Sequence, residues 1–142
     1  MPRIKELFLF DILVAIAKIE ETCKDFTNAD ALKHHYMAWD SVIREFEIIG
    51  EATKNLIGSS LFDTNKRAIV DFRNVLIHEY FGIDEEEVFD ITQNKLCELK
   101  AIVLSHIALI DKELKAELMT DFIDENKHLS FVINALKKIQ RH

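Results

Sequence analysis

The chain has 142 residues and a formal net charge of −7, with 49% apolar and 30% charged residues. This length gives room for one domain with one hydrophobic core, and the apolar content excludes a chain that is disordered throughout. The acidic balance argues against nucleic-acid binding over the whole surface, so any RNA contact should be confined to a local basic cleft. Only three glycines and one proline occur, which favours a few long helices over many short strands.

The first predicted helix covers about residues 4–24 and is apolar on nearly all sides. A helix that is apolar on more than one face is buried on more than one face, and in a protein this small we expect one face to contact a second subunit. The apolar run 7–17 is interrupted by Asp11 and too short to span a membrane. Charged residues follow it where a signal peptide would have its cleavage site, so we expect a cytoplasmic protein.

Cys23 and Cys97 lack metal or redox spacing and are expected to be buried thiols.

The second predicted helix begins at a capping residue, Asn28 or Asp30, and runs to about Gly58. Its core face should consist of residues at helical spacing: Trp39, Val42, Ile43, Phe46, Ile49, Thr53 and Leu56. A separate polar stripe repeats at i, i+4, i+7 and i+11: Asp40, Arg44, Glu47 and Glu51. This stripe is either a solvated face or the lining of a cleft that holds a charged group from the next helix.

Three further helices are predicted after residue 62. The third covers about residues 63–80 and ends near Gly82, and Asp84 with Glu87 should cap a fourth helix that runs to at least Ile110. The fourth helix should direct one set of apolar residues inward: Phe89, Leu96, Leu99, Val103, Ile107 and Ile110. A polar connection at about residues 121–127 should lead to a fifth helix, whose apolar face would hold Leu129, Val132, Ile133, Leu136 and Ile139.

Arg73 stands near the middle of the apolar face of the third predicted helix. An arginine there keeps its proton, so it needs a carboxylate or a phosphate as partner. One interpretation is an ion pair with Glu47 or Glu51. The other is an anion site, in which these carboxylates hold the guanidinium ready for a substrate phosphate.

His78 can either favour the helix dipole or act in acid–base chemistry near neutral pH. It follows Arg73 by five residues, which places the two side chains about 140° apart on a straight helix. Either the helix loosens near His78, or two copies of the motif meet across a symmetric interface. The other histidines lack metal-ligand spacing, and no metalloprotease, nucleotide-binding or serine-hydrolase motif occurs.

Residues 73–82, RNVLIHEYFG, resemble the signature of HepT-type HEPN proteins, the toxin half of HepT/MntA toxin–antitoxin pairs. Residues 43–52, IREFEIIGEA, resemble the second-helix block of this family, and residues 83–100 resemble the start of its fourth helix. The resemblance covers about residues 4–110. It departs from the family in residues 58–66, which lack the usual proline and tryptophan, and in the longer tail.

The resemblance implies an all-α fold: a single HEPN domain over residues 1–142, built as an antiparallel four-helix bundle with an extra C-terminal helix. The core would cover about residues 4–110 and the extension about 111–142. It further implies a homodimer whose two motifs line one cleft, and a metal-independent endoribonuclease that needs no cofactor. An alternative from another class is a non-catalytic binding and regulatory subunit of a minimal nucleotidyltransferase.

The resemblance also assigns roles to individual residues. Arg73 and His78 would be the catalytic pair for RNA cleavage, with Asn74 in support. Tyr80 would accept AMP from ATP through a cognate MntA-like nucleotidyltransferase, which would silence the toxin. The remaining supporting residues near the cleft would be Arg44, Glu47 and Glu51.

Overall fold

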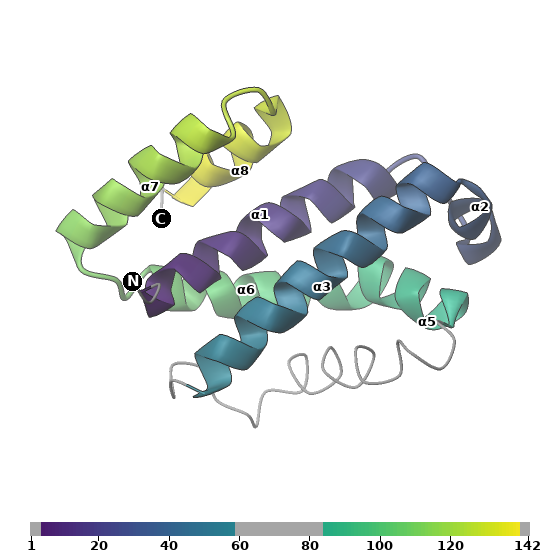
Figure 1. The fold of residues 1–142 in the computed structure, drawn as a ribbon, viewed down its shortest axis with the longest axis horizontal. Helices are drawn as coiled ribbons and strands as arrows, with labels where there is room; N and C mark the ends of the chain where they lie inside the picture. The colour runs from purple at the N-terminus through teal and green to yellow at the C-terminus, as the bar shows by residue number, and fades with distance from the viewer. Residues whose placement is uncertain (1–3, 59–83, 140–142) are drawn as a thin grey trace.

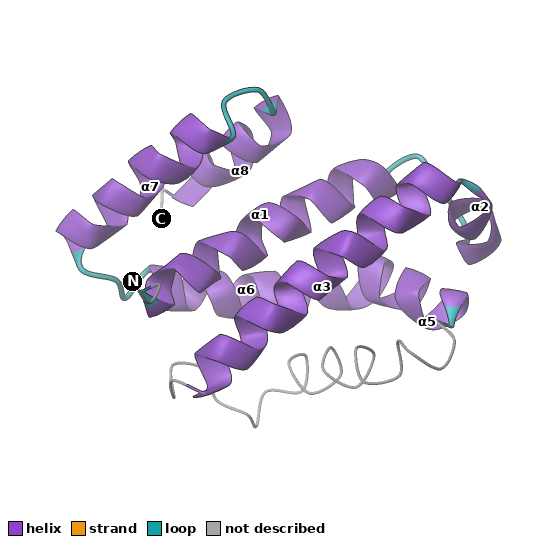
Figure 2. Cartoon of the chain, in the orientation of Figure 1, coloured by secondary structure: helices purple, strands orange, loops and turns teal. Residues whose placement is uncertain are grey.

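The computed structural model describes residues 4–58 and 84–139, and it is helical with no strand in these ranges (Figure 2). The predicted all-α class is therefore confirmed for this part of the chain. The elements are α1 (Lys5–Cys23), α2 (Ala29–His34), α3 (Tyr36–Gly58), α5 (Glu85–Asp90), the π-helical turn η2 (Ile91–Lys95), α6 (Leu96–Ile107), α7 (Lys112–Glu125) and α8 (Ser130–Ile139). Within the described ranges, no helix combines the length and apolar character needed to cross a membrane. The third predicted helix, 63–80, lies outside the described residues.

The helix α1 is the centre of the core, and other helices of the same chain cover its apolar sides. It packs along α3 and also contacts α6, α7 and α8, with α7 and α8 on the side away from α3 (Figure 1). Its fully buried side chains are Leu9, Phe10, Ile12, Ile16 and Ile19. The C-terminal helices bury much of the apolar surface of α1 within the chain, so that surface no longer supports a contact of α1 with a second subunit, which stays a prediction.

The predicted helix 28–58 is divided into α2 and α3 at His35, whose backbone is extended with φ −91° and ψ 90°. Asn28 is the cap of α2, because its side chain accepts a hydrogen bond from the Ala31 amide at 2.8 Å. His35 Nδ1 accepts a hydrogen bond from the Ala38 amide at 3.2 Å and so serves as the cap of α3. The break was missed because neither glycine nor proline marks it. The predicted core face of α3 is confirmed, with Ile43 only half-buried.

The fourth predicted helix begins as expected but is not a single α-helix. Asp84 Oδ1 accepts hydrogen bonds from the Glu86 and Glu87 amides at 3.0 and 3.3 Å. The helical path then continues from α5 through η2 into α6, which ends at Ile107 rather than at Ile110. The predicted inward residues of α6 are buried, whereas Phe89 and Ile110 are half-buried.

The C-terminal extension is a helical hairpin, which corrects the prediction of one extra helix after a polar connection. Asp111 caps α7 through a hydrogen bond from the Leu114 amide at 3.4 Å, and α8 follows a short turn. Most of α7 is exposed, and its apolar stripe is short: Leu118, Met119 and Phe122 are the buried residues. So short a stripe within a polar segment explains why residues 121–125 were predicted as a connection rather than as helix.

Candidate functional site

The polar stripe predicted on the second helix lies on the exposed side of α3, opposite the buried face. Asp40, Arg44, Glu47 and Glu51 are all exposed. Arg44 Nη1 lies 4.0 Å from Glu47 Oε2, and the two side chains are 71% and 46% exposed. An exposed pair at this distance contributes little to stability, so each group can exchange this contact for a substrate or a neighbouring side chain.

Four of the predicted site residues lie outside the described residues: the catalytic pair Arg73 and His78, the supporting residue Asn74 and the modification site Tyr80. The pairing of Arg73 with a carboxylate of α3 therefore stays a prediction. Of the supporting residues, the structure brings together Arg44 and Glu47, while Glu51 presents its carboxylate one turn further along the same stripe.

Glu45 is a titratable residue that sequence reasoning did not select. Its side chain is buried on the face of α3 that packs on α1. Burial raises the pKa of the Glu45 carboxyl, and the positive charges of Lys18 and Arg44 lower it by a smaller amount. A signal was present in the sequence, because helical spacing places Glu45 between Val42 and Ile49 on the apolar face.

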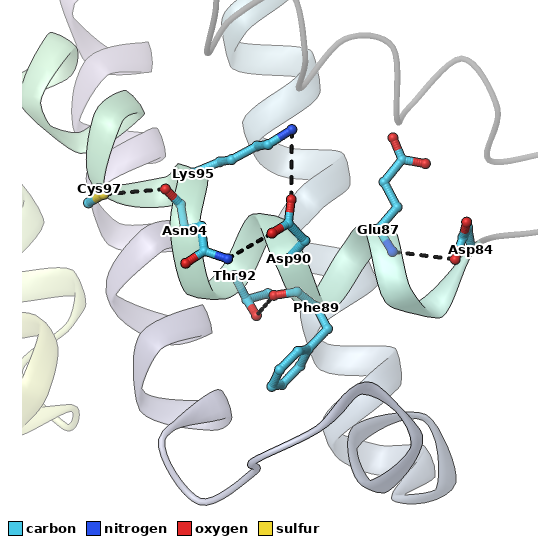
Figure 3. A network of polar contacts seen from close by, with 8 residues as sticks. All are labelled: Asp84, Glu87, Phe89, Asp90, Thr92, Asn94, Lys95 and Cys97. Carbon is cyan, nitrogen blue, oxygen red and sulfur yellow. Dashed lines mark hydrogen bonds and ion pairs between the residues drawn. The ribbon is translucent and has the colours of Figure 1, made fainter.

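The π turn η2 carries a second cluster of polar residues (Figure 3). The Leu96 amide donates to the Ile91 carbonyl, which is the i→i+5 pattern of a π turn. Asp90 accepts a hydrogen bond from Asn94 Nδ2 at 2.7 Å and lies 3.8 Å from Lys95 Nζ. Such turns are frequent at functional positions. Here Asp90, Asn94 and Lys95 contact one another, so these contacts do not by themselves indicate a ligand site.

The two cysteines differ in their surroundings. Cys23 is buried, as predicted, whereas Cys97 is exposed, which corrects the expectation for that residue. Burial raises the pKa of the Cys23 thiol, and a hydrogen bond with Thr92 lowers it by less. Cys23 should therefore stay protonated and unreactive. The Cys97 thiol donates a hydrogen bond to the Asn94 carbonyl at 3.6 Å (Figure 3).

Three histidines of the described ranges, His34, His35 and His106, form hydrogen bonds with nearby backbone groups. His34 Nδ1 donates to the Asp30 carbonyl at 2.8 Å, and His106 Nδ1 donates to the Ile102 carbonyl at 2.8 Å. Carbonyl oxygens only accept hydrogen bonds, so the proton is on Nδ1 in both rings. Over the described residues, no group of three or more His, Cys, Asp or Glu side chains could hold a metal ion.

Over the described residues the protein is helical, and two long helices, α1 and α3, pack together while α3 carries an exposed polar stripe. The HepT-like family, described as ribonuclease HepT-like, matches residues 12–105, and the chain belongs to this family. The match begins in α1 and ends in α6, so it leaves out the C-terminal hairpin. No solved structure matches the chain significantly.

Three curated relatives are similar to the chain. A Methanocaldococcus jannaschii protein named "Gamma-glutamylcyclotransferase and putative RNase" is 31% identical over 139 residues, covering 96% of this chain and 58% of that protein. A second protein of the same organism, named "Putative RNase", is 38% identical over 95 residues, covering 63% of this chain and 75% of its own length. The "Probable ribonuclease HepT" of Thermococcus cleftensis is 33% identical over 103 residues, covering 70% and 93%. The chain thus spans 58% of the length of the first relative, and that match extends into α8.

Proposed function

We propose that this chain is a metal-independent endoribonuclease and the toxin of a toxin–antitoxin pair. The observation that carries the proposal is membership of the HepT-like ribonuclease family in a chain with the Arg73-x4-His78-x-Tyr80 motif. The names of the relatives, as RNases or as a ribonuclease, support the same reaction class.

RNA supplies its own nucleophile, the 2′-hydroxyl, so the protein needs to provide only a base, an acid and a cation. The 2′-hydroxyl loses its proton to a base and attacks the adjacent phosphorus, and the bond from phosphorus to the 5′-oxygen breaks. The leaving 5′-oxygen takes a proton from an acid, which leaves a 2′,3′-cyclic phosphate and a 5′-hydroxyl. His78 transfers protons, and Arg73 binds the phosphate oxygens as their charge increases.

A two-fold dimer places two such motifs in one cleft. Residues about 140° apart on one straight helix reach a single phosphate poorly, but one copy can supply the arginine and the other the histidine. Two arginines and two histidines together create a local positive site on a chain of net charge −7. Asn74 supports the motif. The exposed stripe of α3 adds Arg44, while Glu47 and Glu51 orient Arg73.

A cognate MntA-like nucleotidyltransferase silences the toxin by modifying Tyr80. The Tyr80 hydroxyl attacks the α-phosphorus of ATP, pyrophosphate leaves, and an AMP group remains on the phenolic oxygen. The added phosphate occupies Arg73 and the base fills the cleft, so both effects oppose the entry of RNA.

Expression of the chain alone, beside its His78→Ala variant, tests the proposed reaction. We expect the parent to arrest growth and to cleave unpaired RNA in the presence of a metal chelator, and the variant to do neither. A parent that binds the nucleotidyltransferase but cleaves no RNA would overturn the ribonuclease and favour the non-catalytic regulatory subunit.

A further inference from the structure

A groove runs between α6 and α8, on the side of α1 that the hairpin covers. It consists of two adjoining cavities of about 460 and 250 Å³ that share Leu104 as a lining residue. Leu13 and Ala17 of α1 form part of the floor of the larger cavity, and Phe131 and Ala135 of α8 form part of its wall. The groove is therefore a product of the C-terminal hairpin, since α8 supplies one of its two sides.

Three lysines and two glutamates line this groove on a protein of net charge −7. Lys100 of α6 and Lys138 of α8 line the larger cavity, and Lys115 of α7 lines the smaller one. Glu20 and Glu21 also line the larger cavity.

These two carboxylates already have lysine partners. Glu20 Oε1 lies 3.4 Å from Lys100 Nζ, and Glu21 Oε1 lies 2.5 Å from Lys24 Nζ. Over the described part of the chain, neither Lys115 nor Lys138 has an acidic side chain within ion-pair distance. Two lysine ammonium groups beside an apolar floor thus remain for an acidic ligand.

We propose that the α6–α8 groove binds an acidic, amphipathic peptide segment of a partner protein. Apolar side chains of such a segment would enter the two cavities, and its carboxylates would pair with Lys115 and Lys138. The apolar floor formed by Leu13 and Ala17 fits leucine-like anchors better than the polar backbone of RNA. The side of the groove that α8 supplies lies outside the matched family region, because α7 and α8 follow residue 105, whereas the lining residues of α1 lie within that region.

The partner to test is the nucleotidyltransferase of the proposed function, on which this inference rests. A docking site outside the motif would let that enzyme hold the toxin while it modifies Tyr80. Charged groups at the edge of an interface, here Lys115 and Lys138, mainly affect the association rate and its dependence on salt. Binding should therefore weaken as the salt concentration rises.

The test is a charge reversal with a matched control on the same two helices. Lys115→Glu with Lys138→Glu changes the groove, whereas Lys112→Glu with Lys137→Glu makes the same change of charge at exposed neighbours that do not line it. Affinity for the nucleotidyltransferase is measured by calorimetry, and RNA affinity is measured with a 2′-O-methyl oligouridine, which cannot be cleaved. We expect the groove variant to bind the enzyme about tenfold or more weakly, with RNA affinity unchanged, and the control variant to stay within about twofold of the parent.

The outcomes separate this inference from the proposed function. Equal weakening of enzyme binding in both variants would assign the effect to net charge and overturn the groove site. Unchanged enzyme binding, or a loss confined to RNA binding, would overturn it as well, while RNA cleavage by the parent would leave the ribonuclease proposal standing. A parent that does not bind the nucleotidyltransferase would overturn both the groove site and the proposed silencing.

Discussion

The rings of Phe10 and Phe122 stack with their centroids 5.2 Å apart and their planes at 28°, and they join α1 to α7. Both side chains are buried. Because α1 is apolar on nearly all sides, the C-terminal hairpin completes the core around it. The extension is therefore a structural part of this protein, although it lies beyond the matched family region.

Replacement of Phe122 should show how much stability this contact contributes. Phe122→Ala removes a buried aromatic ring from the α1–α7 interface and should lower the free energy of unfolding by about 3 kcal/mol or more. Urea denaturation measures the change. Leu109→Ala is the control, because Leu109 is 84% exposed, and its effect should stay within about 0.5 kcal/mol. Equal stability of the two variants would contradict the role given to the hairpin.

Glu45 should make stability fall as pH rises. Folding raises the pKa of this carboxyl above its ordinary value of 4.5, so between the two values the native state binds more protons than the unfolded state. Stability is then fully present below 4.5 and is lost as pH rises through the native pKa. Glu45→Gln cannot ionise, so its stability relative to the parent should increase over this range.

Urea denaturation at a series of pH values tests this sign. The matched control is Glu47→Gln, which makes the same change of charge at an exposed position of the same helix, and its profile should follow that of the parent. If the free energy of unfolding of Glu45→Gln changes with pH as that of the parent does, ionisation of the buried carboxyl does not affect folding stability.

The homodimer is a prediction that now rests on the motif alone. Most apolar side chains of α1 are buried within the chain, so they no longer argue for a dimer. The remaining reason for a shared cleft is the angle of about 140° between Arg73 and His78 on a straight helix. We expect a two-fold dimer at micromolar concentration by light scattering. A monomer under these conditions would remove the shared-cleft mechanism.

Arg73 and His78 should differ in their effect on stability. His78→Ala should abolish RNA cleavage and leave the thermal midpoint nearly unchanged. Arg73→Ala should abolish cleavage and also destabilise slightly, by up to about 1 kcal/mol, because Glu47 or Glu51, which are both exposed, would lose a partner. Cleavage at the parental rate by His78→Ala would refute the assignment of the active site.

Tyr80→Phe should keep most of the ribonuclease activity and escape silencing. Incubation with ATP, magnesium and the nucleotidyltransferase should add multiples of AMP to the parent, seen as increments in intact mass. The variant lacks the attacking hydroxyl and should show none. Adducts that persist in Tyr80→Phe would place the acceptor elsewhere.

Local signals in the sequence were sufficient for several elements. The predicted helix 4–24 corresponds to α1 at Lys5–Cys23, because its ends depend on neighbouring residues. Asp84 caps a helix as expected, and Asn28 is the cap of the two candidates Asn28 and Asp30, since a cap is a contact over two or three residues. The α3 core face followed from its 3.6-residue period.

Elements that depend on longer contacts were predicted less well. The break at His35 has no glycine or proline, and its cap is an unusual hydrogen bond from Ala38 to an imidazole. The π turn η2 was not predicted. It brings Asp90 and Lys95 into contact, although a regular α-helix would place these two residues on different sides. Glu45 carried a signal in its position among apolar neighbours but was passed over for the exposed stripe.

The sequence by itself determined the helical class, the helix start at Asp84, the buried face of α3 and the motif that resembles HepT proteins. Only the tertiary structure decided that α7 and α8 pack on the side of α1 away from α3, and that a groove forms between α6 and α8. The physical reason is that periodicity reports which sides of a helix avoid water, whereas the element that covers each side depends on contacts between residues far apart in the chain.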